Sequence, residues 1–208
     1  MTEMTAQNGT GPTSGDRRSR RSDVSRQQIL DVAAKLFRAR GYTETSLRDI
    51  AKLVGMKAGS LYYHFASKEE LAAEVLRIGV KRVHQAVAMA IDTLGQFADA
   101  RSKLAAAMAA HLETLLDESD YTSAHIRCFP YVPETLRIQL GNDRREYEMI
   151  WRTLLDEVAD SDSLPFGMDR SAARLIILGA LNWSLEWQDP AKGVPSELTR
   201  TLLAAFAR

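Results

Sequence analysis

The segment TSLRDIAKLVGMKAGSLYYHFASK, residues 45–68, decides the fold of this chain. Ser46 and Asp49 have the S-x-x-D spacing of a capping box, which predicts a helix that opens at Leu47. Apolar residues then recur at helical spacing as far as Gly55, a residue suited to the left-handed conformation that ends many helices. The segment therefore begins with a short amphipathic helix that is closed by a glycine turn.

A second short helix is expected directly after that turn, over residues 57–65. Ser67 and Glu70 repeat the capping-box spacing and predict the start of a third helix. Two helices joined by a turn that contains glycine form the helix-turn-helix pattern, whose second helix can enter the major groove of DNA. Because helix–glycine–helix also occurs in many all-α folds, spacing alone leaves open a head that contacts a protein instead.

A longer stretch carries a resemblance to a known family. Residues 29–71, ILDVAAKLFRARGYTETSLRDIAKLVGMKAGSLYYHFASKEEL, resemble the signature of TetR-family transcriptional regulators. The resemblance implies an all-α protein in which an N-terminal three-helix helix-turn-helix DNA-binding domain precedes a helical ligand-binding and dimerisation domain. We accordingly expect a disordered basic arm over residues 1–21, the DNA-binding domain over 22–68 and the helical domain over 69–208.

Charge is divided unevenly along the chain, although its formal net charge is zero. Residues 17–68 contain twelve Lys or Arg and four Asp or Glu, whereas residues 69–208 contain fifteen basic and twenty-one acidic side chains. A basic N-terminal module on an acidic body is the electrostatic pattern of a DNA-binding head.

Composition is consistent with an all-α protein of the cytoplasm. The single cysteine, Cys128, excludes an intrachain disulfide, and the polar N-terminus lacks the apolar core of a signal peptide. No apolar run approaches the roughly 20 residues that span a bilayer. We therefore expect a cytoplasmic protein without membrane insertion.

The resemblance assigns base reading to the second helix of the motif. Carried over by position, Tyr62 and His64 look like phosphate or sugar contacts, and Lys68 looks like a phosphate contact. Side chains near the start of the first motif helix are further candidates for phosphate. The predicted DNA-binding residues are Thr43, Thr45, Arg48, Lys57, Ala58, Gly59, Ser60, Tyr62, Tyr63, His64 and Lys68.

The pair Lys57-Ala58 departs from the family pattern, which commonly has Ser or Thr, often followed by Lys. A missing hydroxyl cap costs ~1 kcal/mol if nothing replaces it, and Lys at a helix N-terminus opposes the helix dipole. Either a DNA phosphate or a guanine supplies the missing partner, or Lys57 is a solvated side chain on a weak cap.

Four arginines before the first helix leave a similar choice between a DNA-contacting arm and a solvated tail: Arg17, Arg18, Arg20 and Arg21.

The body is expected to hold a small, largely apolar effector. Methionines and aromatic side chains with few charges suit an apolar pocket, although each is also an ordinary core residue. Residues 181–193, LNWSLEWQDPAKG, resemble TetR-type regulators of fatty-acid and steroid breakdown that respond to acyl-CoA thioesters. The predicted ligand-binding residues are Met89, Met108, His111, Phe129, Tyr147, Trp151 and Trp183.

The last two predicted helices, over residues 169–187 and 195–206, carry apolar faces with small residues. The resemblance implies that two subunits pair these helices as a homodimer, although the same faces could cover the subunit's own core. The predicted interface residues are Leu175, Leu178, Gly179, Asn182, Leu198, Leu202 and Phe206.

No metal, cofactor or catalytic site is predicted. His125 and Cys128 have H-x-x-C spacing, but two ligands do not make a zinc site, and no nucleophile elbow or phosphate loop occurs. We therefore expect a dimeric repressor, not an enzyme, that binds a palindromic double-stranded DNA operator and is released by its effector. A transcriptional activator of the same fold and an all-α binding protein with a non-DNA partner are the alternatives.

Overall fold

The structure is a computed structural model that describes residues 14–118, 120–161, 164–165, 167–187 and 196–207. These residues form helices and connecting turns without any strand, which confirms the all-α prediction. The helices are α1 (Ser14–Arg40), α2 (Leu47–Val54), α3 (Ala58–His64), α4 (Lys68–Thr93), α5 (Ala100–Glu113), the π-helix η1 (Thr114–Glu118), α6 (Asp120–Cys128), the 3-10 helix η2 (Phe129–Tyr131), α7 (Glu134–Gln139), α8 (Gly141–Asp160), α9 (Arg170–Trp187) and α10 (Ser196–Phe206).

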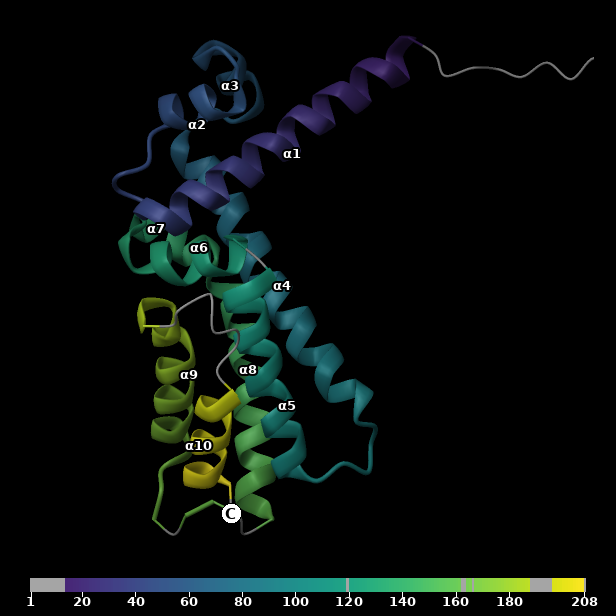
Figure 1. Ribbon diagram of the computed structural model, residues 1–208, viewed down its shortest axis with the longest axis vertical. Helices are drawn as coiled ribbons and strands as arrows, with labels where there is room; N and C mark the ends of the chain where they lie inside the picture. The colour runs from purple at the N-terminus through teal and green to yellow at the C-terminus, as the bar shows by residue number, and fades with distance from the viewer. Residues whose placement is uncertain (1–13, 119, 162–163, 166, 188–195, 208) are drawn as a thin grey trace, which may run out of the picture.

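The molecule is elongated, with a head at one end and a helical body at the other (Figure 1). The head contains α2, α3 and most of α1, while α5, α8, α9 and α10 run roughly alongside one another in the body. Helix α4 descends from the head along the body, and α6 and α7 lie at the level where the two meet. None of the described helices is long and apolar enough to cross a membrane.

The first helix begins earlier than the sequence predicts. A disordered arm over residues 1–21 was expected, but α1 is helical from Ser14 and its first turns project away from the head (Figure 1). Residues 1–13 lie outside the described part of the chain. Extending an existing helix adds one hydrogen bond for each residue fixed, so polar residues can continue a helix that the core has nucleated.

The predicted caps define the ends of the motif helices. The Ser46 hydroxyl accepts a hydrogen bond from the Asp49 amide at 3.2 Å, and Asp49 accepts one from the Ser46 amide at 3.3 Å. Gly55 ends α2 with a φ of 77°, as expected of a left-handed C-cap. These local bonds fix where α2 starts and stops, and so where α3 can begin.

Two hydrophobic clusters form the core. The first joins α1, α2 and α3 to the N-terminal half of α4 and to α6, and it extends to Leu136 and Leu140. The second unites the C-terminal half of α4 with α5, α8, α9 and α10. The first cluster contains residues from both sides of the boundary expected after residue 68, so the packing does not divide at that point.

Helix α6 crosses α4 at Gly79. A Cβ atom at this position would lie 2.2 Å from the Tyr121 carbonyl oxygen and 2.9 Å from Cβ of His125. The Thr122 hydroxyl donates to the Gly79 carbonyl at 3.2 Å, and Nδ1 of His125 bonds the Leu76 carbonyl at 2.8 Å. Helix α4 is continuous through Gly79, and the glycine permits the close approach of α6.

Candidate nucleic-acid interface

A hollow of about 660 Å³ opens on the head where the N-termini of α2 and α4 converge. Free backbone N–H groups and the helix dipole make such termini favourable for anions. Two cationic side chains, Arg48 and Lys68, border the same space. Its lining residues are Thr43, Thr45, Ser46, Leu47, Arg48, Tyr62, Ala66, Ser67 and Lys68.

Lys68 is held at the rim of this hollow by aromatic and carbonyl contacts. Its ammonium lies 4.1 Å from the centre of the Tyr42 ring and donates to the Thr43 carbonyl at 3.3 Å. Burial lowers the pKa of Lys68. The Tyr42 hydroxyl in turn donates to Glu69 at 3.0 Å, and burial raises the Tyr42 pKa to about 12. Sequence reasoning assigned no role to Tyr42, because nothing in the linear order pairs it with Lys68.

The threonines of the α1–α2 loop differ in exposure. Thr43 is exposed beside the hollow, as its predicted contact with phosphate requires. Thr45 is only 1% exposed, and its hydroxyl donates to the Gly41 carbonyl at 2.8 Å. The prediction that Thr45 presents its hydroxyl to phosphate is therefore corrected: the group is used to close the loop.

Helix α3 presents most of the predicted base-reading residues to solvent. Lys57 precedes it without a side-chain cap, as the sequence indicated, and is exposed together with Gly59 and Ser60. Leu61 and Phe65 are buried beneath the helix. Ala58 and His64 are half-buried at its two ends.

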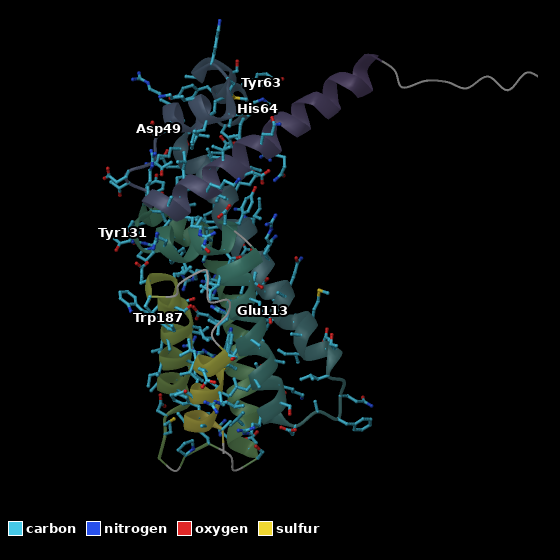
Figure 2. All side chains as sticks on the ribbon, in the orientation of Figure 1. Asp49, Tyr63, His64, Glu113, Tyr131 and Trp187 are labelled. Atoms are coloured by element: carbon cyan, nitrogen blue, oxygen red, sulfur yellow. The ribbon has the colours of Figure 1, made fainter. Side chains whose placement is uncertain are left out.

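Two tyrosines stand on the outer face of α3. Tyr62 is 55% and Tyr63 is 84% exposed, and the Tyr63 ring meets His64 edge-on with 5.5 Å between the ring centres. Figure 2 shows Tyr63 and His64 at the end of the head, away from the body. The two adjacent aromatic rings therefore lie in water and do not join the core beneath this seven-residue helix.

Four of the seven predicted ligand-binding residues lie together in the body: Met108 and His111 on α5, with Tyr147 and Trp151 on α8, are all buried. His111 bonds the Tyr147 hydroxyl at 2.6 Å through Nδ1 and the Asn182 side-chain oxygen at 3.1 Å through Nε2. Burial lowers the pKa of His111 to about 4, so the ring is neutral at pH 7. Because the Asn182 oxygen only accepts, Nε2 carries the proton and the Tyr147 hydroxyl donates to Nδ1.

Trp151 completes this buried group. Its ring centre lies 5.9 Å from that of His111 and 6.2 Å from that of Tyr147, and His84 of α4 approaches Tyr147 at 6.0 Å. The indole Nε1 is buried and makes no hydrogen bond of good geometry among the described residues, although its N–H interacts with the Tyr147 hydroxyl and opposes the rise in the Tyr147 pKa that burial causes. A poorly paired buried donor is costly, so a better-placed acceptor would satisfy this N–H.

The other three predicted ligand-binding residues lie elsewhere and do not join this buried group. Met89 is 69% exposed and Trp183 is 66% exposed. Phe129 packs against the first hydrophobic cluster, and its ring stacks on that of His125 with 5.4 Å between the ring centres. Met89 follows the buried Val87 by two residues, about 200° around a helix, so it faces away from the core.

The predicted dimer residues also separate into two groups. Leu202 and Phe206 are buried in the subunit's own core, so their assignment to the interface is corrected. Leu178 and Leu198 pack partly against that core and Asn182 bonds His111, but all three stay partly exposed, and their place at the interface remains a prediction. The outer face of α9 is open among the described residues. A row of exposed residues at a spacing of four runs along it: Leu175, Gly179, Trp183 and Trp187.

Helix α9 lies at an edge of the body, with Trp187 on its outer side (Figures 1 and 2). Ile176, also exposed and not predicted, adds to the apolar surface. Spacing alone could not separate inward from outward positions on a helix that has apolar residues on several sides.

A capped helix-turn-helix head above an all-helical body defines a class of DNA-binding regulators. Residues 29–75 match the family described as bacterial regulatory proteins, tetR family, and residues 98–204 match the tetracyclin repressor-like C-terminal domain. The chain belongs to the TetR family of DNA-binding transcriptional regulators.

The relatives that this chain resembles include a transcriptional repressor and a transcriptional activator. The transcriptional repressor KstR2 of Rhodococcus jostii (strain RHA1) is 52% identical over 52 residues, which are 25% of this chain and 26% of the relative. This match therefore spans about a quarter of the relative's length. The transcriptional activator FasR of Mycolicibacterium smegmatis is 28% identical over 186 residues, covering 84% of this chain and 76% of FasR.

A solved structure of AibR in complex with isovaleryl coenzyme A and operator DNA has the same fold. Its TM-score is 0.77 at 19% identity, and the alignment covers 88% of this chain and 98% of that chain.

Proposed function

We propose that this protein is a homodimeric repressor that binds a palindromic operator and is released by a small, largely apolar effector. The observation that carries the proposal is the hollow between the N-termini of α2 and α4, adjoining the exposed face of α3. The hollow suits a backbone phosphate, and α3 then points into the major groove beside it.

The residues of α3 and the lysine before it fall into two groups, one placed for base edges and one for the DNA backbone. Lys57, Gly59 and Ser60 lie at its N-terminal end, where a recognition helix meets base edges. Tyr62 borders the phosphate hollow, so its hydroxyl is placed for the backbone instead. The basic charge of residues 17–68 and the acidic charge of the body favour an approach to DNA by the head.

Dimerisation is supported by the open face of α9. Its row of Leu175, Trp183 and Trp187 with Gly179 between them is a large apolar surface with no partner among the described residues. A two-fold dimer pairs the same surface of both subunits and gives two recognition helices for the two half-sites of a palindrome.

The effector is proposed to bind near the buried cluster of His111, Tyr147 and Trp151. The indole N–H, which is only weakly paired with the Tyr147 hydroxyl, would donate to an effector oxygen, and the surrounding apolar side chains would cover the remainder. An acyl-CoA thioester is one candidate, because the AibR structure shows that this fold can hold one together with DNA. Release from DNA requires that the effector bind the non-binding conformer more tightly.

DNA binding is tested by fluorescence anisotropy on duplexes from the flanking intergenic DNA over a salt series. We expect tight, sequence-selective binding whose log K falls steeply with log salt. Tyr62→Ala/Lys68→Ala should weaken it and reduce the salt slope by about 1. The matched control, Tyr131→Ala/Arg152→Ala, removes an exposed tyrosine and an exposed cation from outside the head and should change neither. Salt-insensitive or absent binding would favour a non-DNA partner.

The effector is tested by adding CoA thioesters to the preformed complex. Release should occur with the wild type and require several-fold more thioester with Trp151→Phe, which keeps a ring but loses the N–H. Tyr131→Phe, which removes an exposed polar hydrogen away from this cluster and from the proposed dimer face, serves as the control. A transcription assay decides whether the protein represses or activates its target genes. Activation is the second candidate function, because the chain resembles the activator FasR.

A further inference from the structure

An open apolar groove lies between the C-terminal part of α4 and the middle of α8. It has a volume of about 310 Å³, and its apolar lining is Ala88 and Ile91 from α4 with Met149, Ile150 and Leu154 from α8. None of the seven residues predicted to bind the effector lines it. Met149 is half exposed here, so the apolar surface is open to a ligand from solvent.

Three carboxylates and Thr153 form the polar part of the groove. Asp92, Glu146 and Glu157 line it alongside the apolar residues. Lys103 donates to Glu157 at 2.8 Å, whereas Asp92 and Glu146 have no ion pair within the described part of the chain. The groove therefore keeps two uncompensated negative charges beside its apolar floor.

The end of α4 adds to this negative potential. The helix ends at Thr93, one residue beyond Asp92, and its last turn contains no basic residue. The C-terminal end of a helix carries a partial negative charge that lysine or arginine often balances. Here the C-terminal end of α4 and the two carboxylates both make the electrostatic potential of the groove more negative.

We propose that this groove binds a small lipophilic cation, an ammonium group carried by an aromatic or branched alkyl body. The volume admits a compact ligand, the floor suits its apolar part, and the carboxylates suit its charge. A CoA thioester, which is an anion, would be repelled here, so the groove is separate from the proposed effector site. The inference goes beyond the proposed function, because binding of the cation requires no DNA.

The test compares three probes of similar shape and different charge: phenethylamine, phenethyl alcohol and hydrocinnamate. They are titrated into the full chain with carbon-13 labels in the methionine methyl groups. The amine should shift the Met149 methyl signal and bind about fivefold more tightly than the alcohol, with hydrocinnamate weakest. The buried Met108 methyl should not respond. A Met149 signal that ignores the amine, or equal binding of amine and hydrocinnamate, overturns the proposal.

Variants then assign the charge preference to its source. Asp92→Asn/Glu146→Gln should bring the amine and the alcohol to equal affinity while leaving the alcohol's affinity unchanged. Glu44→Gln/Glu113→Gln removes the same charge from two exposed positions elsewhere and should keep the fivefold preference. A preference that survives in the first variant refutes the assignment. Since no DNA is present, failure here is distinguishable from failure of operator binding.

Discussion

Lys57 stands at the start of α3 without a capping hydrogen bond, and its charge opposes the positive end of the helix. Lys57→Ser supplies a hydroxyl for the free amides of the first turn. We expect the free energy of unfolding of the DNA-free protein to rise by about 1 kcal/mol, measured by urea denaturation.

Lys52→Ser is the matched control, since it removes a lysine from the last turn of α2, where the charge is favourable. It should leave stability unchanged or lower it slightly. Lys57→Ser should also alter the preference of the protein among operator sequences. An unchanged preference would refute base reading by Lys57 and leave only its effect on the cap.

His111 and His125 are both buried, and burial lowers the pKa of each to about 4. The unfolded chain takes up these protons near pH 6.5 and the folded chain does not, so stability is complete above that pH and falls as pH decreases towards 4. Between about pH 6.5 and about pH 5 each ring should cost about 2 kcal/mol of unfolding free energy.

Urea denaturation as a function of pH measures this dependence. His125→Gln removes one of the two titrating rings, so its stability should fall less steeply with decreasing pH than that of the wild type. The same steepness in both proteins would show that His125 does not contribute.

At the scale of single elements, α6 connects the head to the body. It packs against both α1 and α4. Arg127 donates to the Arg38 carbonyl on α1 at 2.7 Å and to Glu186 on α9 at 2.7 Å. Arg38 itself pairs with Asp120 at the start of α6. A change at α9 or in the body core therefore has a direct route of contacts to the head.

Gly79→Ala tests how tightly α6 and α4 are pressed together. Alanine favours a helix over glycine by about 1 kcal/mol, but here its Cβ would lie 2.2 Å from a backbone oxygen, which cannot move without displacing α6. We expect a net destabilisation of about 1–3 kcal/mol in urea denaturation.

Gly59→Ala is the control, because nothing lies within 4 Å of its added Cβ. That change should be neutral or stabilising. If Gly79→Ala behaved in the same way, the close contact between α4 and α6 would be contradicted.

Local signals predicted the helices best where a side chain fixes a backbone group. The capping box of Ser46 and Asp49, the cap at Ser67 and the glycine turn at Gly55 set the motif correctly. The early start of α1, the π-helical turn η1 and the role of Gly79 depend on helix propagation and on neighbours distant in sequence. No local pattern encodes those contacts.

For the whole molecule, the open face of α9 predicts assembly. Trp183→Glu places a charge in the centre of that face and should convert the dimer into a monomer, as measured by sedimentation. Operator affinity should fall with it, because one recognition helix reads only one half-site. Ile138→Glu, at a similarly exposed position on α7, should leave a dimer. A dimeric Trp183→Glu protein would place the interface elsewhere.

The head was more predictable than the body for a physical reason. Head residues such as Ser46 and Tyr63 lie in a short segment whose helices are set by local caps. The group of His111, Tyr147 and Asn182 assembles from three helices, and Asn182 was assigned to another surface. Composition could suggest which residue types gather in a body pocket, but only the packing shows which of them meet.

The hydrophobic cluster shared by α1, α4 and α6 has a practical consequence for engineering. A chimeric regulator made by joining this head to a foreign body after Lys68 would leave Leu71, Leu76 and Ala124 on the discarded side, although they complete the core of the head. The transplantable unit extends past α7 to about Leu140. Exchanging heads between such regulators therefore means exchanging more than half of the chain.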